Sequence, residues 1–280
     1  MHFFSRGRRV LATAAAAAVL ISASLFSAGA ASAAPPPPAR MAALGDSITQ
    51  AAMSCSSLIS CPTNSWSTGS TASVNSHSAR LRAAGAASLV VYNNAVSGAA
   101  SSALPGQAQK AVAQGAQYVT IEIGANDACT KTAGAMTPAA TFRANVQSAL
   151  TTLAASPASP EIFVASIPSL QRMYDLNKSS VSARLVWGLL KICQSMLEKP
   201  TSTSAADVQR RAAVQQRVNE YNQALAAACA SVAKCRYDGG AVANYAFSKA
   251  DISTRDYFHP SLSGQATLAA VTWARTQWAS

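Results

Sequence analysis

The sequence predicts an α/β fold built on an open, doubly wound parallel sheet. Five short apolar runs have strand length and are rich in β-branched or aromatic residues. Their near-continuous hydrophobicity is typical of strands buried on both faces of a parallel sheet. Helical patterns lie between the runs, and strands alternating with helices favour a doubly wound sheet. The runs cover residues 41–44, 89–92, 118–123, 162–167 and, more weakly, 235–237.

Four segments carry the helical patterns. The longest is amphipathic at helical spacing, and the second begins with Thr137-Pro138, a signal for a helix N-terminus. The expected helices cover residues 76–84, 137–153, 205–230 and 261–278.

Polar and glycine-containing segments follow the first three runs. They are Gly45–Ser47, Asn93–Gly98 and Gly124–Asp127. Ligands of open α/β sheets bind beyond the carboxyl ends of the strands, so we expect these three segments to converge at one edge of the sheet.

The first 34 residues have the pattern of an export signal. Arg6, Arg8 and Arg9 form a positive region, residues 10–30 carry no charge, and Ala31-Ser32-Ala33 has the small residues of a cleavage site. We therefore predict a signal peptide at 1–34, an extended Pro-rich lead-in at 35–40 outside the fold, and one domain at 41–280. A membrane anchor is the alternative interpretation of the apolar run. The predicted location of the mature protein is extracellular.

The chain is basic but sparsely charged. Its formal net charge is +11 with only 12% charged residues. Three arginines lie in the leader, so the mature chain would carry about +8, which favours anionic surfaces such as phospholipid headgroups or serves solubility alone. No block of Lys and Arg indicates a nucleic-acid partner, and we expect a monomer.

Six cysteines follow the leader, and an even number in an exported chain predicts disulfides. The simplest pairing joins them in sequence order, as Cys55–Cys61, Cys129–Cys193 and Cys229–Cys235. A zinc site is the competing interpretation. The cysteines form no C-x-x-C pairs and histidine is scarce, so no metal site is expected.

Ser47 follows the first apolar run and is either a helix cap or a nucleophile. A nucleophilic serine needs a base, and only His77 and His259 follow the leader. His259 lies three residues after Asp256 in a turn, where the carboxylate can reach the imidazole Nδ1–H and leave Nε2 free to accept a proton. His77 is expected to be an exposed polar residue at the start of a helix.

Donors for an oxyanion are available at the other strand ends. Gly98 has no side chain to keep a substrate carbonyl from its N–H, and the side-chain amide of Asn126 can be aimed at the same point. Taken separately, an Asn-Asp pair after a strand usually marks only a turn. The order of these residues along the chain strengthens the catalytic interpretation.

Four segments together resemble the blocks of the SGNH hydrolases, also called GDSL lipases and esterases. These are "GDS" at 45–47, the loop at Gly98, "GAND" at 124–127 and "DYFH" at 256–259. They occur in the family's order across nearly all of the mature chain. Ile48 stands where the name GDSL has leucine, a substitution common in the family.

The resemblance implies a three-layer α/β/α sandwich with a five-stranded, parallel, flavodoxin-like sheet. It also implies Ser47 as nucleophile, His259 as base and Asp256 as its support. The implied oxyanion hole comprises the N–H groups of Ser47 and Gly98 and the side chain of Asn126, and no cofactor is implied. Some secreted bacterial relatives support the histidine with a backbone carbonyl instead, so both supports remain open here.

The expected reaction is hydrolysis of carboxylic esters. The cysteine layout and "CPTNSWSTG" resemble the secreted bacterial lipase and phospholipase A branch, which favours lipid or small ester substrates and transient contact with a lipid interface. The apolar segment 182–200 is either a lipid-facing or acyl-chain wall, or a helix packed on the core and pinned through Cys193. The alternatives are a carbohydrate esterase that removes acetyl groups from polysaccharide and an exported binding protein without catalysis.

Overall fold

The computed structural model describes residues 1–4, 34–56 and 58–279. The chain divides into two units, Met1–Ala33 and Ala34–Ser280, and the account below concerns the second. Nearly all of the predicted signal peptide, at residues 5–33, lies outside the described residues.

Five parallel strands form one sheet in the order β2-β1-β3-β4-β5. This confirms the predicted α/β fold with a five-stranded parallel sheet, and each of the five apolar runs contains a strand. The strand in the fourth run ends before the run does, because Ala165–Ile167 already belong to the loop beyond the sheet. The strands are β1 (Arg40–Gly45), β2 (Val90–Asn93), β3 (Tyr118–Glu122), β4 (Glu161–Val164) and β5 (Cys235–Tyr237).

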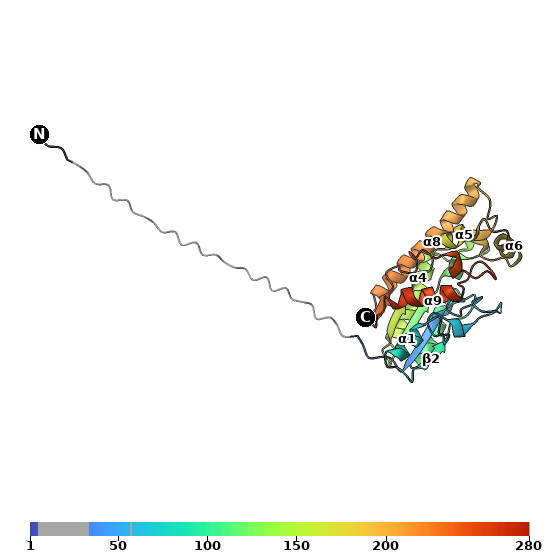
Figure 1. The fold of residues 1–280 in the computed structure, drawn as a ribbon, viewed down its shortest axis with the longest axis horizontal. Helices are drawn as coiled ribbons and strands as arrows, with labels where there is room; N and C mark the ends of the chain where they lie inside the picture. The colour runs from blue at the N-terminus through green and yellow to red at the C-terminus, as the bar shows by residue number, and fades with distance from the viewer. Residues whose placement is uncertain (5–33, 57, 280) are drawn as a thin grey trace. The chain divides into compact units, whose positions relative to one another are not determined.

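Helices cover both faces of the sheet (Figure 1). The four expected helices are present as α1, α4, α8 and α9, although α9 stops at Trp273. The last five residues of that predicted segment, 274–278, form turns instead. The α-helices of the described residues are α1 (His77–Ala83), α2 (Leu104–Ala113), α3 (Ala125–Ala128), α4 (Ala139–Ala154), α5 (Leu170–Asn177), α6 (Val181–Leu189), α7 (Gln194–Leu197), α8 (Ala205–Ala230) and α9 (Leu262–Trp273).

One helical layer consists of α2, α4 and α8, which pack against one another. The ring of Phe142 in α4 stacks on Tyr221 in α8, with centroids 4.2 Å apart. Short 3-10 turns at Pro62–Asn64, Ser101–Ala103, Ala133–Ala135 and Lys249–Asp251 complete the connections.

The opposite layer contains α1 and α9, and His77 joins them to the sheet. The prediction that His77 is exposed was wrong, although it does begin α1: its side chain is fully buried. Nδ1 lies 2.8 Å from the hydroxyl of Tyr118 in β3, and Nε2 lies 2.8 Å from the hydroxyl of Thr272 in α9. Both ring nitrogens thus have hydrogen-bond partners, which allows the imidazole to be buried in the core.

The Pro-rich lead-in is also less separate than predicted. Arg40 already belongs to β1. The carbonyl of Ala39 accepts a hydrogen bond from Val90 N–H at 2.9 Å, and the carbonyl of Pro35 accepts one from the indole of Trp278 at 2.8 Å. Part of the lead-in therefore packs against the domain.

The apolar segment 182–200 forms two helices rather than one. α6 ends at Leu189 and α7 begins after Cys193, whose φ of +40° interrupts the helical path. Trp187, Met196 and Leu197 are buried, whereas residues on the outer side of α6 are exposed. The buried residues fit the interpretation of a segment packed on the core, while the lipid-facing interpretation of the exposed residues stays a prediction.

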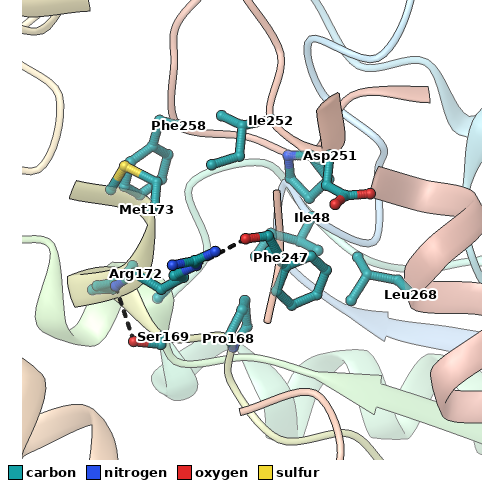
Figure 2. A pocket seen from close by; sticks show the side chains of 13 residues that line it. Ile48, Pro168, Ser169, Arg172, Met173, Phe247, Asp251, Ile252, Phe258 and Leu268 are labelled. Atoms are coloured by element: carbon teal, nitrogen blue, oxygen red, sulfur yellow. Dashed lines mark hydrogen bonds between the residues drawn. The ribbon is translucent and has the colours of Figure 1, made fainter. Parts of the chain in front are cut away.

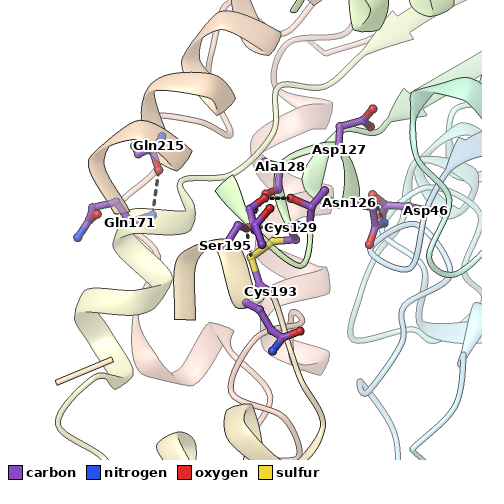
Figure 3. The surroundings of a disulfide bond; sticks show 12 residues. Asp46, Asn126, Asp127, Ala128, Cys129, Gln171, Cys193, Ser195 and Gln215 are labelled. Atoms are coloured by element: carbon purple, nitrogen blue, oxygen red, sulfur yellow. Dashed lines mark hydrogen bonds between the residues drawn. A yellow bond between two sulfur atoms is a disulfide. The ribbon is translucent and has the colours of Figure 1, made fainter. Parts of the chain in front are cut away.

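The six described cysteines lie in three pairs at disulfide-bonding distance, in sequence order: Cys55–Cys61, Cys129–Cys193 and Cys229–Cys235. Figure 3 shows the second pair, which joins the end of α3 to the start of α7. Among the described residues, no helix has the length and apolar character needed to cross a bilayer.

Candidate active site

The three polar segments predicted to converge lie beyond neighbouring strands, because β1 is flanked by β2 and β3. The turn out of β1 depends on Gly45. Its φ is +142°, and a Cβ there would lie 2.1 Å from the carbonyl oxygen of Glu122 in β3. Only glycine allows this close approach of the two strands, which sets the position of the Asp46-Ser47 turn that follows.

Ser47, His259 and Asp256 form one chain of contacts across the end of the sheet. The hydroxyl of Ser47 lies 2.8 Å from Nε2 of His259. The Nδ1 atom of the same ring contacts a carboxylate oxygen of Asp256. Of the two supports that the sequence left open for Nδ1, the structure has the carboxylate.

The loop after β5 is shaped to hold Asp256 in place. The other carboxylate oxygen accepts the backbone N–H groups of Phe258 at 3.0 Å and His259 at 3.1 Å. Tyr257, between Asp256 and Phe258, has φ +55°, and a bridge between Ile252 and Pro260 closes the loop. The Asp256 side chain is fully buried, so its geometry is fixed before any substrate arrives.

Two residues that line one cleft, Ser47 and Gly98, have a backbone N–H without a protein acceptor among the described residues. Within residues 34–56 and 58–279, the N–H of neither Ser47 nor Gly98 donates to protein. Gly98 has φ +82°, and no atom lies within 4 Å of where a Cβ would be. Glycine is required here by its backbone conformation, and the space beside it is open to a ligand.

The side-chain amide of Asn126, from α3, lies at the same place. Its nitrogen donates to the carbonyl of Ala99 at 3.0 Å and approaches the carboxylate of Asp46 at 3.4 Å. Figure 3 shows Asn126 and Asp46 side by side. The longer contact leaves one amide hydrogen weakly bonded, so that hydrogen is available to a substrate oxygen.

Three buried side chains that the sequence analysis missed hold this arrangement together. Gln107 of α2 bonds both backbone groups of Gly45, at 2.7 and 2.9 Å. Gln265 of α9 donates to the carbonyl of Ile48 at 2.8 Å. Asp127 accepts the N–H and hydroxyl of Ser101, at 2.8 and 2.7 Å. Of these, only Asp127 has a sequence signal, its place in the "GAND" segment.

Two carboxyl groups are buried beneath the donors. Burial raises the pKa of Asp46 to about 7, opposed by the hydrogen bond from Ile48 N–H and by the charge of His259. Burial, with the nearby charge of Asp46, also holds the pKa of Glu122 well above its ordinary value. Neither carboxyl oxygen of Glu122 has a hydrogen-bond partner among the described residues. A protonated Glu122 keeps negative charge away from a point where an oxyanion would form.

Ser47 and His259 open into a cleft of about 560 Å³. Gly98 and Asn126 also line it, and its outer walls carry apolar side chains: Leu58, Ile59, Ile192 and Phe258. Figure 2 shows a separate apolar cavity of about 50 Å³ on the other side of Phe258, bordered by Met173, Ile252 and Leu268. Neither Ser47 nor His259 lines this smaller cavity, so the open cleft is the space that both residues reach.

A family model described as the GDSL-like Lipase/Acylhydrolase family matches residues 43–267. The chain belongs to this family. The match spans every site residue described above, and membership makes the chain a carboxylic ester hydrolase of the SGNH, or GDSL, type. No curated protein matches the chain.

Several solved structures resemble this GDSL hydrolase. LAE5, an α/β hydrolase from the metagenome of Lake Arreo in Spain, is 18% identical with a TM-score of 0.55, over 90% of this chain and 100% of that one. The phospholipase A1 of Streptomyces albidoflavus NA297 is 18% identical with a TM-score of 0.49, over 85% and 100%. An extracellular lipase of Streptomyces rimosus is 17% identical with a TM-score of 0.48, over 85% and 99%. At such identity, the likeness to LAE5 shows a shared fold.

Proposed function

We propose that this GDSL hydrolase is a secreted serine esterase that cleaves carboxylic esters of lipids, in the manner of a lipase or phospholipase A. The observation that carries the proposal is the 2.8 Å contact between Ser47 Oγ and His259 Nε2 at the floor of an open cleft. A serine hydroxyl so placed can pass its proton to the imidazole as it attacks a carbonyl.

The first half of the reaction acylates the serine. His259 takes the proton of Ser47, and the serine oxygen attacks the ester carbonyl. Asp256 stabilises the imidazolium that forms. The N–H groups of Ser47 and Gly98 and the amide of Asn126 bind the oxyanion. The tetrahedral intermediate then collapses, and the alcohol leaves with the proton from His259.

The second half releases the acid. A water molecule gives a proton to His259 and attacks the acyl carbonyl, and the same three donors hold the second oxyanion. Collapse of this intermediate returns the proton to Ser47 and frees the carboxylic acid. The residues present supply each proton transfer of this cycle.

The walls of the cleft support a lipid substrate. Leu58, Ile59, Ile192 and Phe258 line the same cleft as Ser47 and offer it apolar surface. An acyl chain gains about 0.8 kcal/mol for each methylene it buries against such walls. A short acetyl group would leave most of that surface unused.

Export from the cell is supported by the predicted leader and by the three cysteine pairs, since disulfides persist in oxidising compartments. An extracellular enzyme would meet lipid esters at cell surfaces or in released lipid.

A substrate panel tests this proposal. We expect hydrolysis of p-nitrophenyl esters to rise with acyl length beyond acetyl, and phosphatidylcholine vesicles to be cleaved in preference to acetylated xylan. Ser47→Ala should lower the turnover by a factor of at least about 10³. Ser179→Ala, at an exposed serine outside the cleft, is the matched control and should be unchanged. A preference for acetylated xylan would contradict the lipid assignment and leave the esterase chemistry standing.

A further inference from the structure

α6 has apolar side chains on two opposite faces, of which one is buried and the other is exposed to solvent. Ala183 and Trp187 face the protein and are 0% and 2% exposed. Val181, Leu185 and Leu189 lie four residues apart on the opposite face and are 63%, 69% and 81% exposed. This spacing aligns the three side chains in one row along the helix. This stripe of exposed side chains is as apolar as the face by which a helix normally packs on a protein core.

The inner face of α6 is fixed directly to the catalytic loop. The indole of Trp187 donates to the carbonyl of Tyr257 at 3.3 Å, two residues before His259. Downstream, Cys193 is paired with Cys129 at the end of α3. The helix is therefore held in place from its inner side, and the outer leucines contribute nothing to that attachment.

The exposed stripe continues to the mouth of the catalytic cleft. Leu190 is 50% exposed, and the next two residues, Lys191 and Ile192, line the cleft. Leu58 and Ile59, 63% and 68% exposed, line the same cleft. We call Leu58, Ile59, Leu185, Leu189 and Leu190 the apolar rim. Apolar side chains around a cleft mouth gain free energy when they enter the boundary of a lipid layer.

The charges beside the apolar rim are positive. Between Leu176 and Leu197 the chain has Lys178, Arg184 and Lys191 but no acidic residue. Lys178 is paired with Asp175 at 2.6 Å, which leaves Arg184 and Lys191 without a carboxylate partner among the described residues. Each basic side chain near an anionic leaflet adds to the attraction between the protein and the lipid. The basic mature chain acts in the same direction.

We propose that the apolar rim docks on an anionic phospholipid surface and so presses the mouth of the catalytic cleft against the lipid. The leucines enter the boundary of the acyl layer, while Arg184 and Lys191 meet the lipid phosphates. A lipid ester then reaches Ser47 without crossing water. This docking serves the hydrolysis of lipid esters proposed above and rests on it.

Vesicle binding tests the docking surface apart from catalysis. The proteins are Ser47→Ala alone, the same protein with Leu185→Ser and Leu189→Ser, and the same protein with Val90→Ser. Val90 is 44% exposed at the start of β2, the strand end away from the cleft, and serves as the matched control. Binding is measured by co-sedimentation with vesicles of phosphatidylglycerol and phosphatidylcholine in equal parts, and with phosphatidylcholine alone. The leucine substitutions are also made in the active enzyme and assayed on soluble p-nitrophenyl butyrate.

We expect Ser47→Ala to bind the anionic vesicles more tightly than the neutral ones and to lose affinity as salt is added. The two leucine substitutions should weaken binding by about tenfold or more, while Val90→Ser leaves it unchanged. Hydrolysis of p-nitrophenyl butyrate should persist in the leucine variant, which shows that its fold is intact.

Equal vesicle binding with and without the leucines would overturn the docking surface. So would a wild-type dimer that the leucine substitutions convert to a monomer without loss of vesicle binding, since the stripe would then be an interface between two copies. Vesicle binding by a protein that hydrolyses no lipid ester would support the surface and refute the proposed function. Hydrolysis of lipid esters without vesicle binding would refute the docking surface and support the proposed function.

Discussion

At the scale of single residues, the carboxylate of Asp256 determines which ring nitrogen of a neutral His259 carries the proton. It is buried, it accepts two backbone N–H groups, and it contacts Nδ1 of the imidazole. This arrangement keeps the proton on Nδ1 and leaves Nε2 free to accept the proton of Ser47.

Asp256→Asn should therefore lower turnover on p-nitrophenyl butyrate by roughly 10³ to 10⁴, because an amide can present a hydrogen to Nδ1 and favour the wrong tautomer. KM should change little, since Asp256 does not line the cleft. Asn244→Ala, at an exposed asparagine in the loop after β5, should retain full turnover. A turnover in Asp256→Asn within tenfold of wild type would mean that His259 is oriented by something else.

The sequence predicted the three residues that the structure brings into contact and missed glutamines that hold the neighbouring backbone in place. Ser47, His259 and Asp256 stood out because nucleophile, base and acid are rare types in a recognisable order. Gln107 and Gln265 did not, since a glutamine in a helix is usually on the surface and nothing local shows that it bonds a strand end. His77 was misjudged for a related reason. Only the three-dimensional partners, Tyr118 and Thr272, make its burial favourable.

At the scale of elements, continuous apolar runs were sufficient to locate the sheet. α2 was missed because the residues it buries include Gln107, Ala108 and Ala111, which form no strong apolar stripe. The division of segment 182–200 into α6 and α7 was also missed, because the break lies at Lys191 and Cys193, which have φ values of +54° and +40° without a glycine or proline to signal it.

The pairing of Cys129 with Cys193 should matter more to stability than the others. Cys129 and Cys193 are 64 residues apart, whereas Cys229 and Cys235 are separated by six. In the chain-entropy description, the longer loop contributes roughly 4 kcal/mol and the shorter one roughly 2.

Urea unfolding of the double variants Cys129→Ser/Cys193→Ser and Cys229→Ser/Cys235→Ser measures this difference. We expect the free energy of unfolding to fall by roughly twice as much in the first variant as in the second. A larger loss in the second variant would show that local packing around α8 and β5, rather than loop length, sets the contribution of each pair.

At the scale of the whole molecule, buried ionisable groups make stability depend on pH. Burial, together with the charge of Arg80, lowers the pKa of His77 from its ordinary 6.5 to about 3. Between these values the unfolded chain takes up a proton that the folded protein refuses, so stability falls as the pH drops from 6.5 to about 3. The raised pKa values of Asp46 and Glu122 act in the opposite sense, because the contribution of each group is present at low pH and is lost as the pH rises through its folded-state pKa, which for Asp46 is about 7.

The contribution of His77 to the pH dependence of stability can be measured from the slope of the free energy of unfolding against pH. His77→Gln should be less stable near neutral pH, because it loses aromatic packing, but its free energy of unfolding should fall less steeply below pH 6.5. Over the full range the difference between the two curves should change by roughly 5 kcal/mol. Glu122→Gln is the counterpart, and its stability should fall less than that of wild type as the pH rises through neutrality. Parallel curves for His77→Gln and wild type would contradict a neutral, buried imidazole.

The central claim is that Ser47 is a nucleophile activated by His259. Covalent labelling by an organophosphonate ester, with the modified peptide identified by mass spectrometry, tests it most directly. We expect one label, on Ser47, in wild type and in Ser179→Ala, and none in Ser47→Ala or in a folded His259→Ala. A label on another residue, or equally fast labelling of Ser47 without His259, would contradict the account.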